Sequence, residues 1–181
     1  MSTLARHSAM RALAMVGILS AALTAKTANA ECDKDSINVG SRLPELKGAV
    51  DGNNKSFSIK SIKGWTFLTV GAEWCAPCKK ELPAWDKIAP EFKGKITFVA
   101  VNINHDMKDG KRFNEKLKLK NMNLVYMNED KAGSLALTMP STFIADPKGI
   151  VRIAHCGFEK QDVDGEVKKM RADLAKLVDA K

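Results

Sequence analysis

The 181-residue sequence lacks several features that would place it in other classes of protein. Beyond the first thirty residues, no segment is apolar enough to cross a membrane. No basic run is interleaved with aromatic residues, and no internal repeat or low-complexity tract divides the chain. Histidine is also scarce, with three in the whole chain. These absences leave one continuous domain as the simplest organisation.

The first thirty residues, 1–30, have the pattern of a secretory signal peptide. Two arginines form a basic head, the stretch 12–25 is apolar and uncharged, and Ala28-Asn29-Ala30 has the small-x-small pattern of a cleavage site. We predict export to the periplasm or another compartment outside the cytoplasm, with cleavage after Ala30. The alternative is an uncleaved membrane anchor; a lipid anchor is disfavoured because Glu31 precedes Cys32.

The predicted mature chain, residues 31–181, is long enough for one domain with a hydrophobic core. Removing Arg6, Arg11 and Lys26 lowers the formal charge from +8 to +5. The remaining excess is scattered through amphipathic stretches, which favours a solvated surface over a nucleic-acid site. We therefore predict no nucleic-acid partner and no stable membrane insertion after cleavage.

Hydrophobic periodicity predicts an α/β fold. Strands separated by helices imply a parallel centre, and a late hairpin adds antiparallel strands, so the central β-sheet should be mixed, with helices on both faces. The expected elements are a turn-rich hairpin over 39–64, a strand at 65–72, a helix from Cys75 that Pro90 ends, a strand at 95–103, a helix at 108–119, a strand at 123–128, a short helix before Pro140, a hairpin of 141–146 with 150–156, and a helix at 163–177.

All four cysteines lie in the predicted mature chain, which suggests oxidising surroundings and disulfides. The spacing of Cys75 and Cys78 favours pairing them with each other, which leaves Cys32 with Cys156. A structural Cys32–Cys156 disulfide is one interpretation. The other is that Cys156, on the last strand, is a free or auxiliary redox thiol.

The Cys75-Ala76-Pro77-Cys78 segment suits thiol exchange. Thiolates are the attacking species, and the start of a helix makes a thiol more acidic through unpaired N–H groups and the helix dipole. Cys75 lies where the buried strand meets the helix, and Cys78 lies one helical turn further. Pro77 fits the first turn, where its missing N–H costs no hydrogen bond. We expect an exposed attacking sulfur in Cys75 and a shielded resolving sulfur in Cys78.

Metal binding is the main rival interpretation. A zinc site needs two further ligands at regular spacing, and the predicted mature chain offers only His105, His155 and two distant cysteines. We therefore predict no resident metal and no other cofactor. Two alternatives stay open: a two-thiolate Cu(I) site, since soft thiolates suit that ion, and a purely structural Cys75–Cys78 disulfide.

Two sequence motifs resemble a known family. "WCAPCKKELP" (residues 74–83) and "MPSTFIADPKG" (residues 139–149) resemble the exported TlpA/ResA-like thiol-disulfide oxidoreductases of the thioredoxin superfamily. The resemblance extends over essentially all of 31–181. It implies a thioredoxin fold with an N-terminal β-hairpin extension, and some TlpA-like proteins carry a second disulfide comparable to a Cys32–Cys156 bridge.

The resemblance also implies roles for single residues. Cys75 matches the attacking cysteine and Cys78 the resolving one, and Trp74 matches the tryptophan beside them. Pro140 matches a cis-proline that faces the cysteines and shapes the groove for a partner chain. Glu81 matches a glutamate near the cysteine pair; three residues after Cys78, it would share a helix face with that cysteine and could tune the thiols or transfer a proton. The alternative is a solvent-facing helix glutamate.

Two positions depart from the pattern of thioredoxin itself. Thr69 replaces a buried aspartate that lies six residues before the first cysteine, so proton transfer has to involve Glu81, water or the partner. Met139 stands where a smaller or β-branched residue is common, and it makes the predicted groove, formed with Trp74, Pro77 and Pro140, more apolar. We assign no catalytic role to the histidines or to Trp65 and Trp85.

The resulting hypothesis is a periplasmic protein-disulfide reductase. Protein thiols and disulfides are its expected partners, and by resemblance a membrane thiol-electron transporter returns it to the reduced form. The resemblance implies apocytochrome c thiols or metal-site cysteines of oxidase assembly factors as substrates. The alternatives are a Cu(I)-handling or docking module and a thiol oxidase that uses the same residues, since sequence does not determine the direction of electron flow.

Overall fold

The computed structural model describes residues 32–158 and 162–179. The predicted signal peptide and its cleavage site therefore lie outside the described residues. Within the two described ranges, no helix has the length and apolar character needed to cross a bilayer.

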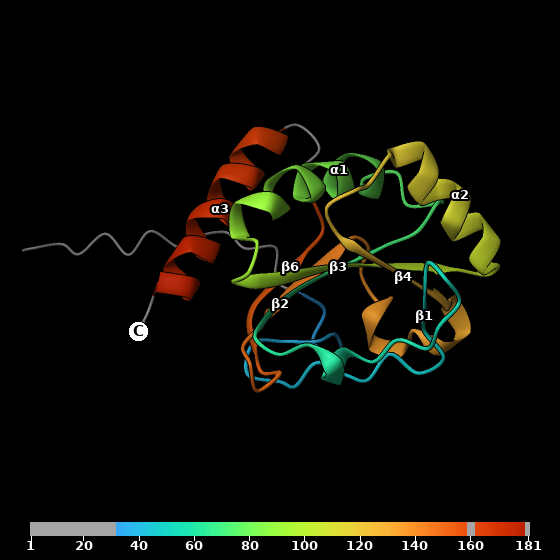
Figure 1. Cartoon of the computed structure of the whole chain (residues 1–181), viewed down its shortest axis with the longest axis horizontal. Coiled ribbons are helices and arrows are strands. Elements are labelled where there is room, and N and C mark those ends of the chain that lie inside the picture. Colours follow the sequence, from blue (N-terminus) through green and yellow to red (C-terminus); the bar gives the residue numbers. More distant parts are fainter. Residues whose placement is uncertain (1–31, 159–161, 180–181) are drawn as a thin grey trace, which may run out of the picture.

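A six-stranded mixed sheet forms the centre of the molecule, in the order β1-β4-β3-β2-β5-β6 (Figure 1). Strands β2, β3 and β4 are parallel, β5 and β6 form the late antiparallel hairpin, and β1 pairs antiparallel with β4. This confirms the predicted thioredoxin-like fold. The strands are β1 Val50–Asp51, β2 Trp65–Gly71, β3 Ile96–Asn104, β4 Asn123–Asn128, β5 Ser141–Ala145 and β6 Val151–Cys156.

The two faces of the sheet are covered by different kinds of structure. The α-helices α1 (Cys78–Ile88), α2 (Met107–Leu117) and α3 (Val163–Asp179) lie together on one face (Figure 1). The other face carries the N-terminal segment and short 3-10 helices, η1 (Ile59–Ser61), η3 (Glu129–Lys131) and η4 (Gly133–Leu135). Helices thus occupy both faces, but those on the second face are single turns.

Each face of the sheet has its own hydrophobic core. Successive residues of a strand point to opposite faces, so Phe67 packs under the α-helices while Leu68 packs under the N-terminal segment. Trp85, Leu82 and Ile88 of α1 are fully or almost fully buried in the helix-side core. The helical spacing of these residues in the sequence predicted this buried face.

The expected N-terminal hairpin is reduced to a tight turn. Asp51 N–H donates to the Lys55 carbonyl at 2.8 Å, and a single bridge joins Val50 to Ser56. Strand β1 then pairs with β4 instead of continuing the hairpin. Turn residues break the apolar alternation too often for a longer ladder, so most of 39–64 covers the sheet as irregular chain.

Helix α1 is shorter at its start than the expected helix. It begins at Cys78 with Pro77 as its N-cap, so Cys75 lies in the preceding loop. Pro83 lies inside the helix, which ends at Ile88 before the 3-10 helix η2 (Ala89–Phe92) that contains Pro90.

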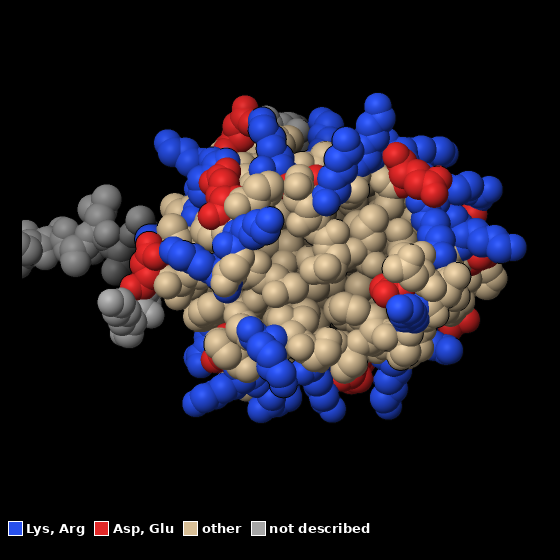
Figure 2. All heavy atoms as spheres, viewed as in Figure 1, with Lys and Arg blue, Asp and Glu red and all other residues tan. Residues whose placement is uncertain are grey.

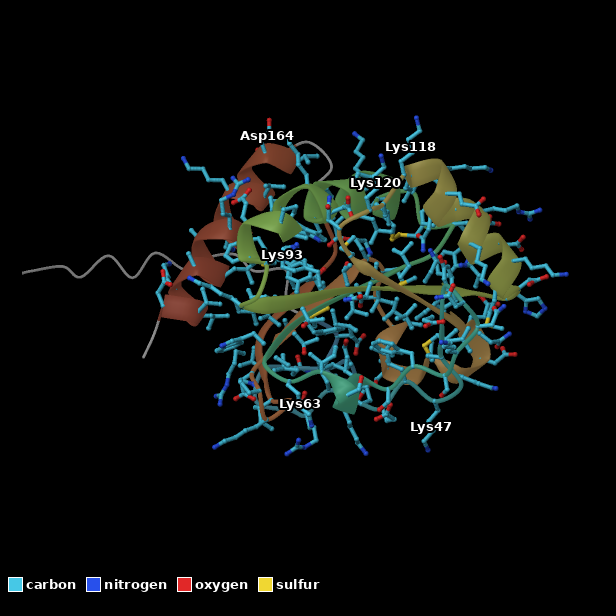
Figure 3. The ribbon with its side chains drawn as sticks, in the orientation of Figure 1. Lys47, Lys63, Lys93, Lys118, Lys120 and Asp164 are labelled. Carbon is cyan, nitrogen blue, oxygen red and sulfur yellow. A yellow bond between two sulfur atoms is a disulfide. The ribbon has the colours of Figure 1, made fainter. Side chains whose placement is uncertain are left out.

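Basic side chains are dispersed over the surface in view. Figure 2 shows lysines and arginines around the rim of this face, with an uncharged area at its centre. In Figure 3, Lys47 and Lys118 extend away from the body on opposite sides of the molecule. This arrangement agrees with the expectation of scattered, solvated charge.

Candidate active site

The loop between β2 and α1 carries the cysteine pair. The sulfur atoms of Cys75 and Cys78 form a disulfide, with Cα atoms 5.4 Å apart. The backbone N–H of Cys78, at the first position of α1, donates to Cys75 Sγ at 3.3 Å. A helix N-terminus therefore supplies a hydrogen bond that would stabilise a thiolate on Cys75.

Both cysteines are buried in the oxidised form. Cys78 has no exposed surface and Cys75 is only 4% exposed, which differs from the expectation of an exposed sulfur in Cys75. The disulfide holds Cys75 Sγ close to the first N–H of α1, so the sulfur lies against the protein. The relative exposure of the two cysteines agrees with the expectation, since Cys75 is more exposed to solvent than Cys78.

Neighbouring polar groups fix the loop that precedes the cysteines. The Glu73 N–H donates to Asn104 Oδ1 at 3.2 Å, which ties the start of the loop to the end of β3. Asn104 in turn donates to Oδ1 of the buried Asn102. Trp74, the next residue, is 58% exposed and stands beside the buried Cys75.

Pro140 precedes β5 and follows a cis peptide bond with Met139, as the resemblance implied. The Pro140 carbonyl accepts a hydrogen bond of 2.8 Å from Gly157 N–H, which ties the proline to the end of β6. Met139 is partly buried and packs against the cores of both faces.

The second disulfide lies next to this proline. Cys32 and Cys156 are joined with Cα atoms 5.0 Å apart, and Cys156 is the cross-strand partner of Ser141, the residue after Pro140. The N-terminal segment is thereby attached to the sheet at the edge of the proline turn.

Glu81 is the most perturbed ionisable group near the cysteines. Its side chain is completely buried, so it is not a solvent-facing helix glutamate. Burial raises the pKa of Glu81 to about 8, although hydrogen bonds from Trp85 and Thr142 oppose the rise and the charge of Glu166 adds to it. Glu81 is therefore mainly a neutral carboxylic acid at pH 7.

Oε1 of Glu81 is held from two sides. Trp85 Nε1 donates to it at 2.7 Å from the next turn of α1, and the Thr142 hydroxyl oxygen lies 3.0 Å away on β5. The same Thr142 oxygen lies 3.0 Å from the hydroxyl oxygen of Thr69 on β2. Oε2 of Glu81 has no hydrogen-bond partner within the described part of the chain.

The sequence predicts only part of this hydrogen-bonded group. It marks Thr69 as the replacement of an aspartate, and it indicates no catalytic role for Trp85 or Thr142. The structure places Trp85 and Thr142 against the Glu81 side chain and joins Thr69 to Thr142. The polar residues inside otherwise apolar strands are visible in the sequence. The strand register that aligns Thr69 with Thr142 is visible only in the structure.

The residues in 32–158 and 162–179 contain no cluster of three or more His, Cys, Asp or Glu side chains suited to an ion. The pair of sulfurs beside a buried carboxylic acid is suited to reversible thiol–disulfide exchange with proton transfer.

Comparison with known proteins assigns this site to a family. The AhpC/TSA family model matches residues 39–154, which include both cysteines and Pro140. The chain belongs to the AhpC/TSA family.

Relatives with thioredoxin-type names and a solved structure of the same fold are also similar to the chain. The chain is 30% identical over 125 residues to "Thioredoxin-like protein YneN" of Bacillus subtilis, covering 67% of this chain and 73% of the relative. It is 26% identical over 142 residues to "Thiol-disulfide oxidoreductase ResA" of Bacillus thuringiensis, covering 76% and 82%. A putative thiol:disulfide interchange protein DsbE of Chlorobium tepidum has the same fold, with a TM-score of 0.62, 22% identity, and 76% and 98% coverage. This AhpC/TSA-family chain is a thiol-disulfide oxidoreductase of the thioredoxin type.

Proposed function

We propose that this protein reduces disulfides of partner proteins in the periplasm or another exported compartment. The Cys75 thiolate attacks one sulfur of a partner disulfide, and the other partner sulfur leaves and takes up a proton. Cys78 then loses its proton and attacks Cys75 Sγ, which releases the second partner sulfur. Two electrons pass from the cysteine pair to the partner, and the enzyme is left in the disulfide form described above.

Glu81 has a role in both directions of this cycle. When a reductant opens the Cys75–Cys78 bond, Cys78 leaves as a thiolate and takes a proton from the neutral carboxyl of Glu81, three residues further along α1. In the forward reaction, the ionised carboxylate takes that proton back.

The burial of Glu81 is the observation that favours a reductant over an oxidant. Strong oxidants stabilise the thiolate of their reduced form, usually with nearby positive charge. Here the residues between the cysteines are Ala76 and Pro77, which carry no charge. The two lysines that follow Cys78 are exposed to solvent, and the next side chain, the carboxyl of Glu81, is buried. Any negative charge on Glu81 disfavours a thiolate on Cys78, so the disulfide form gains relative stability.

The face beside Cys75 offers an apolar contact surface for a partner. Trp74 and Leu137 are 58% and 52% exposed, and Met139 and Pro140 follow Leu137 by two and three residues. We assign Trp74, Pro77, Met139 and Pro140 to the groove that receives the partner chain around its disulfide. By resemblance, the substrates are apocytochrome c or metal-site cysteines, and a membrane thiol-electron transporter is the reductant.

The reduction potential of the Cys75–Cys78 pair tests the direction of electron flow. It is measured in glutathione or dithiothreitol buffers, with a Cys32→Ser/Cys156→Ser variant as the control that removes the other disulfide. A value closer to about −270 mV than to about −120 mV supports a reductant. A value near the upper figure would make the protein an oxidant and refute the proposal.

Cysteine variants test the assignment of the two sulfurs. Cys75→Ser is expected to abolish exchange, whereas Cys78→Ser is expected to accumulate a mixed disulfide with the partner, seen as a mass adduct that reductant removes. Full turnover by Cys75→Ser would contradict the mechanism. Cu(I) handling by the reduced pair is the alternative, and tight stoichiometric Cu(I) binding without reductase activity would favour it.

A further inference from the structure

A row of polar side chains crosses three strands beneath helices α1 and α3. In the sheet register, Thr69 of β2 is directly opposite Thr142 of β5, and Thr142 is directly opposite His155 of β6. Residues that face each other in antiparallel strands project from the same side of the sheet with Cβ atoms about 5 Å apart. His155 is therefore the neighbour of the threonine whose hydroxyl lies 3.0 Å from Glu81.

Two carboxyl groups lie above this row, one from each helix. Glu81 comes from α1 and Glu166 from α3, and these helices lie next to each other on the same face (Figure 1). His155 Nε2 is 3.5 Å from Glu166 Oε2, an ion-pair distance without a well-formed hydrogen bond. The two glutamates interact across the row, because the charge of Glu166 contributes to the raised pKa of Glu81.

Burial decreases towards the outer end of this path. The side chain of Glu81 is fully buried, that of His155 is 10% exposed, and that of Glu166 is 18% exposed. Glu81 Oε2 and His155 Nε2 are both buried without a hydrogen-bond donor or acceptor among the residues described. Each can therefore give or take a proton without first breaking a hydrogen bond.

A cavity of about 260 Å³ lies at the outer end, between β6 and α3. His155 and Glu166 line it on one side, and charged side chains from both elements surround them: Arg152, Lys169, Asp173 and Lys176. Burial lowers the pKa of His155, the charge of Glu166 opposes this, and the charge of Lys169 adds to it. A neutral imidazole can accept a proton on one nitrogen and donate one from the other, as a proton carrier requires.

We propose that His155 and Glu166 form the proton path between the buried Glu81 carboxyl and the solvent-facing cavity beside α3. This inference rests on the proposed role of Glu81 in thiol exchange. When the disulfide is opened, the Glu81 proton goes to the Cys78 thiolate, and Glu81 is left as a carboxylate. His155 takes up a proton from the cavity, and Glu166 stabilises the transient imidazolium. The imidazolium then donates a proton towards Glu81 past Thr142 and returns to the neutral form. When Cys78 gives up its proton, the same transfers run outward.

The chain contains a matched control for this pair. His105 and Glu129 also form a histidine–glutamate pair at 3.5 Å, but the His105 side chain is 83% exposed. We would compare His155→Ala with His105→Ala, and Glu166→Gln with Glu129→Gln, in the complete protein. The first readout, from pH 5 to 9, has two parts: the rate at which dithiothreitol opens the Cys75–Cys78 disulfide, and the rate at which the Glu81 carboxyl, followed by its infrared band, regains a proton afterwards.

The variants at His155 and Glu166 are expected to slow the return of a proton to Glu81 roughly tenfold at neutral pH, whereas Glu81→Gln should slow the opening itself by the ~100-fold or more that general acid catalysis can contribute. Added imidazoles should restore the rate of His155→Ala, more strongly as their basicity rises, and should not affect His105→Ala. A purely structural role for His155 gives no dependence on the basicity of the added base. The second readout is the pKa of Glu81 in the oxidised protein, followed by carboxyl NMR, which Glu166→Gln should lower and Glu129→Gln should leave unchanged.

The outcomes separate this proposal from the proposed function. If His155→Ala and Glu166→Gln match their control variants while Glu81→Gln is slow, the proton path is refuted and the role of Glu81 stands. If Glu81→Gln is as fast as the wild type, the proposed mechanism itself is wrong. If His155→Ala does not fold, the rate and the Glu81 pKa in Glu166→Gln decide the matter.

Discussion

Glu81→Gln should make the folding stability of the oxidised protein less dependent on pH. Folding raises the pKa of Glu81 from 4.5 to about 8, so between these values the folded state binds more protons than the unfolded state. The contribution of Glu81 to stability is complete below pH 4.5 and decreases as the pH rises towards 8. Gln keeps the size of the side chain and does not ionise, so this decrease should disappear.

The size of the effect follows from the two pKa values. Glu81 is fully buried, so solvent screening is small, and the wild type should lose roughly 3 to 4 kcal/mol of unfolding free energy from this group between pH 5 and pH 8. His155, whose pKa is lowered by burial, acts in the opposite direction below about pH 6.5, but it does so in both proteins. The difference between wild type and variant therefore isolates Glu81.

Guanidinium unfolding under non-reducing conditions, at pH values from 5 to 9, measures this difference. Glu91→Gln is the control, because Glu91 is a surface carboxylate paired with Arg171. The free-energy difference between wild type and Glu81→Gln should change steadily across this range in favour of the variant at high pH. Parallel pH profiles for the two proteins would show that Glu81 ionises normally, and would remove the basis for its role as a proton donor.

Three further changes test other parts of the structure. Replacing Cys32 and Cys156 by serine opens a loop with a sequence separation of 124 and should lower the free energy of unfolding by about 5 kcal/mol. Thiol exchange at Cys75 and Cys78 should be unchanged. A loss of stability below about 1 kcal/mol would contradict this. Asp146 accepts hydrogen bonds from its own turn and from an arginine, which hold its pKa below the usual range despite burial. Asp146→Asn should therefore cost about 1 to 3 kcal/mol at pH 7 and less as the pH falls through that lowered pKa, so a pH-independent difference would count against the assignment. Gly110→Ala places a Cβ 2.7 Å from Asn102 Oδ1 and should destabilise the protein by about 1 to 3 kcal/mol, although alanine normally favours a helix. An increase in thermal stability would refute this expected destabilisation.

The sequence predicted the features that depend on neighbours along the chain. Apolar runs and helical spacing predicted the central strands and the buried face of α1, and short motifs located the cysteine pair and Pro140. The turn-rich hairpin of the N-terminal segment is present as a tight turn with a single bridge between Val50 and Ser56, and the pairing of β1 with β4 was not predicted.

The features that depend on packing between distant segments were not predictable in the same way. Glu81 shares a helix face with Cys78, but its complete burial depends on β5 and α3 covering that face. The alignment of Thr69, Thr142 and His155 depends on the register of three strands. Periodicity within one strand gives the face on which a residue lies and does not give its partner across the sheet.

The pairing of Cys32 with Cys156 constrains the order in which the chain matures. Synthesis begins at the N-terminus, so Cys32, Cys75 and Cys78 all emerge before Cys156. An oxidant that joined cysteines in their order of appearance would link Cys32 to Cys75 and block the exchange site. The native pairs instead join the first cysteine to the last and the middle two to each other. Direct formation of the native pairs therefore requires β6 to lie beside β5 before Cys32 reacts. A wrong pair formed earlier has to be rearranged by thiol exchange before the site can work.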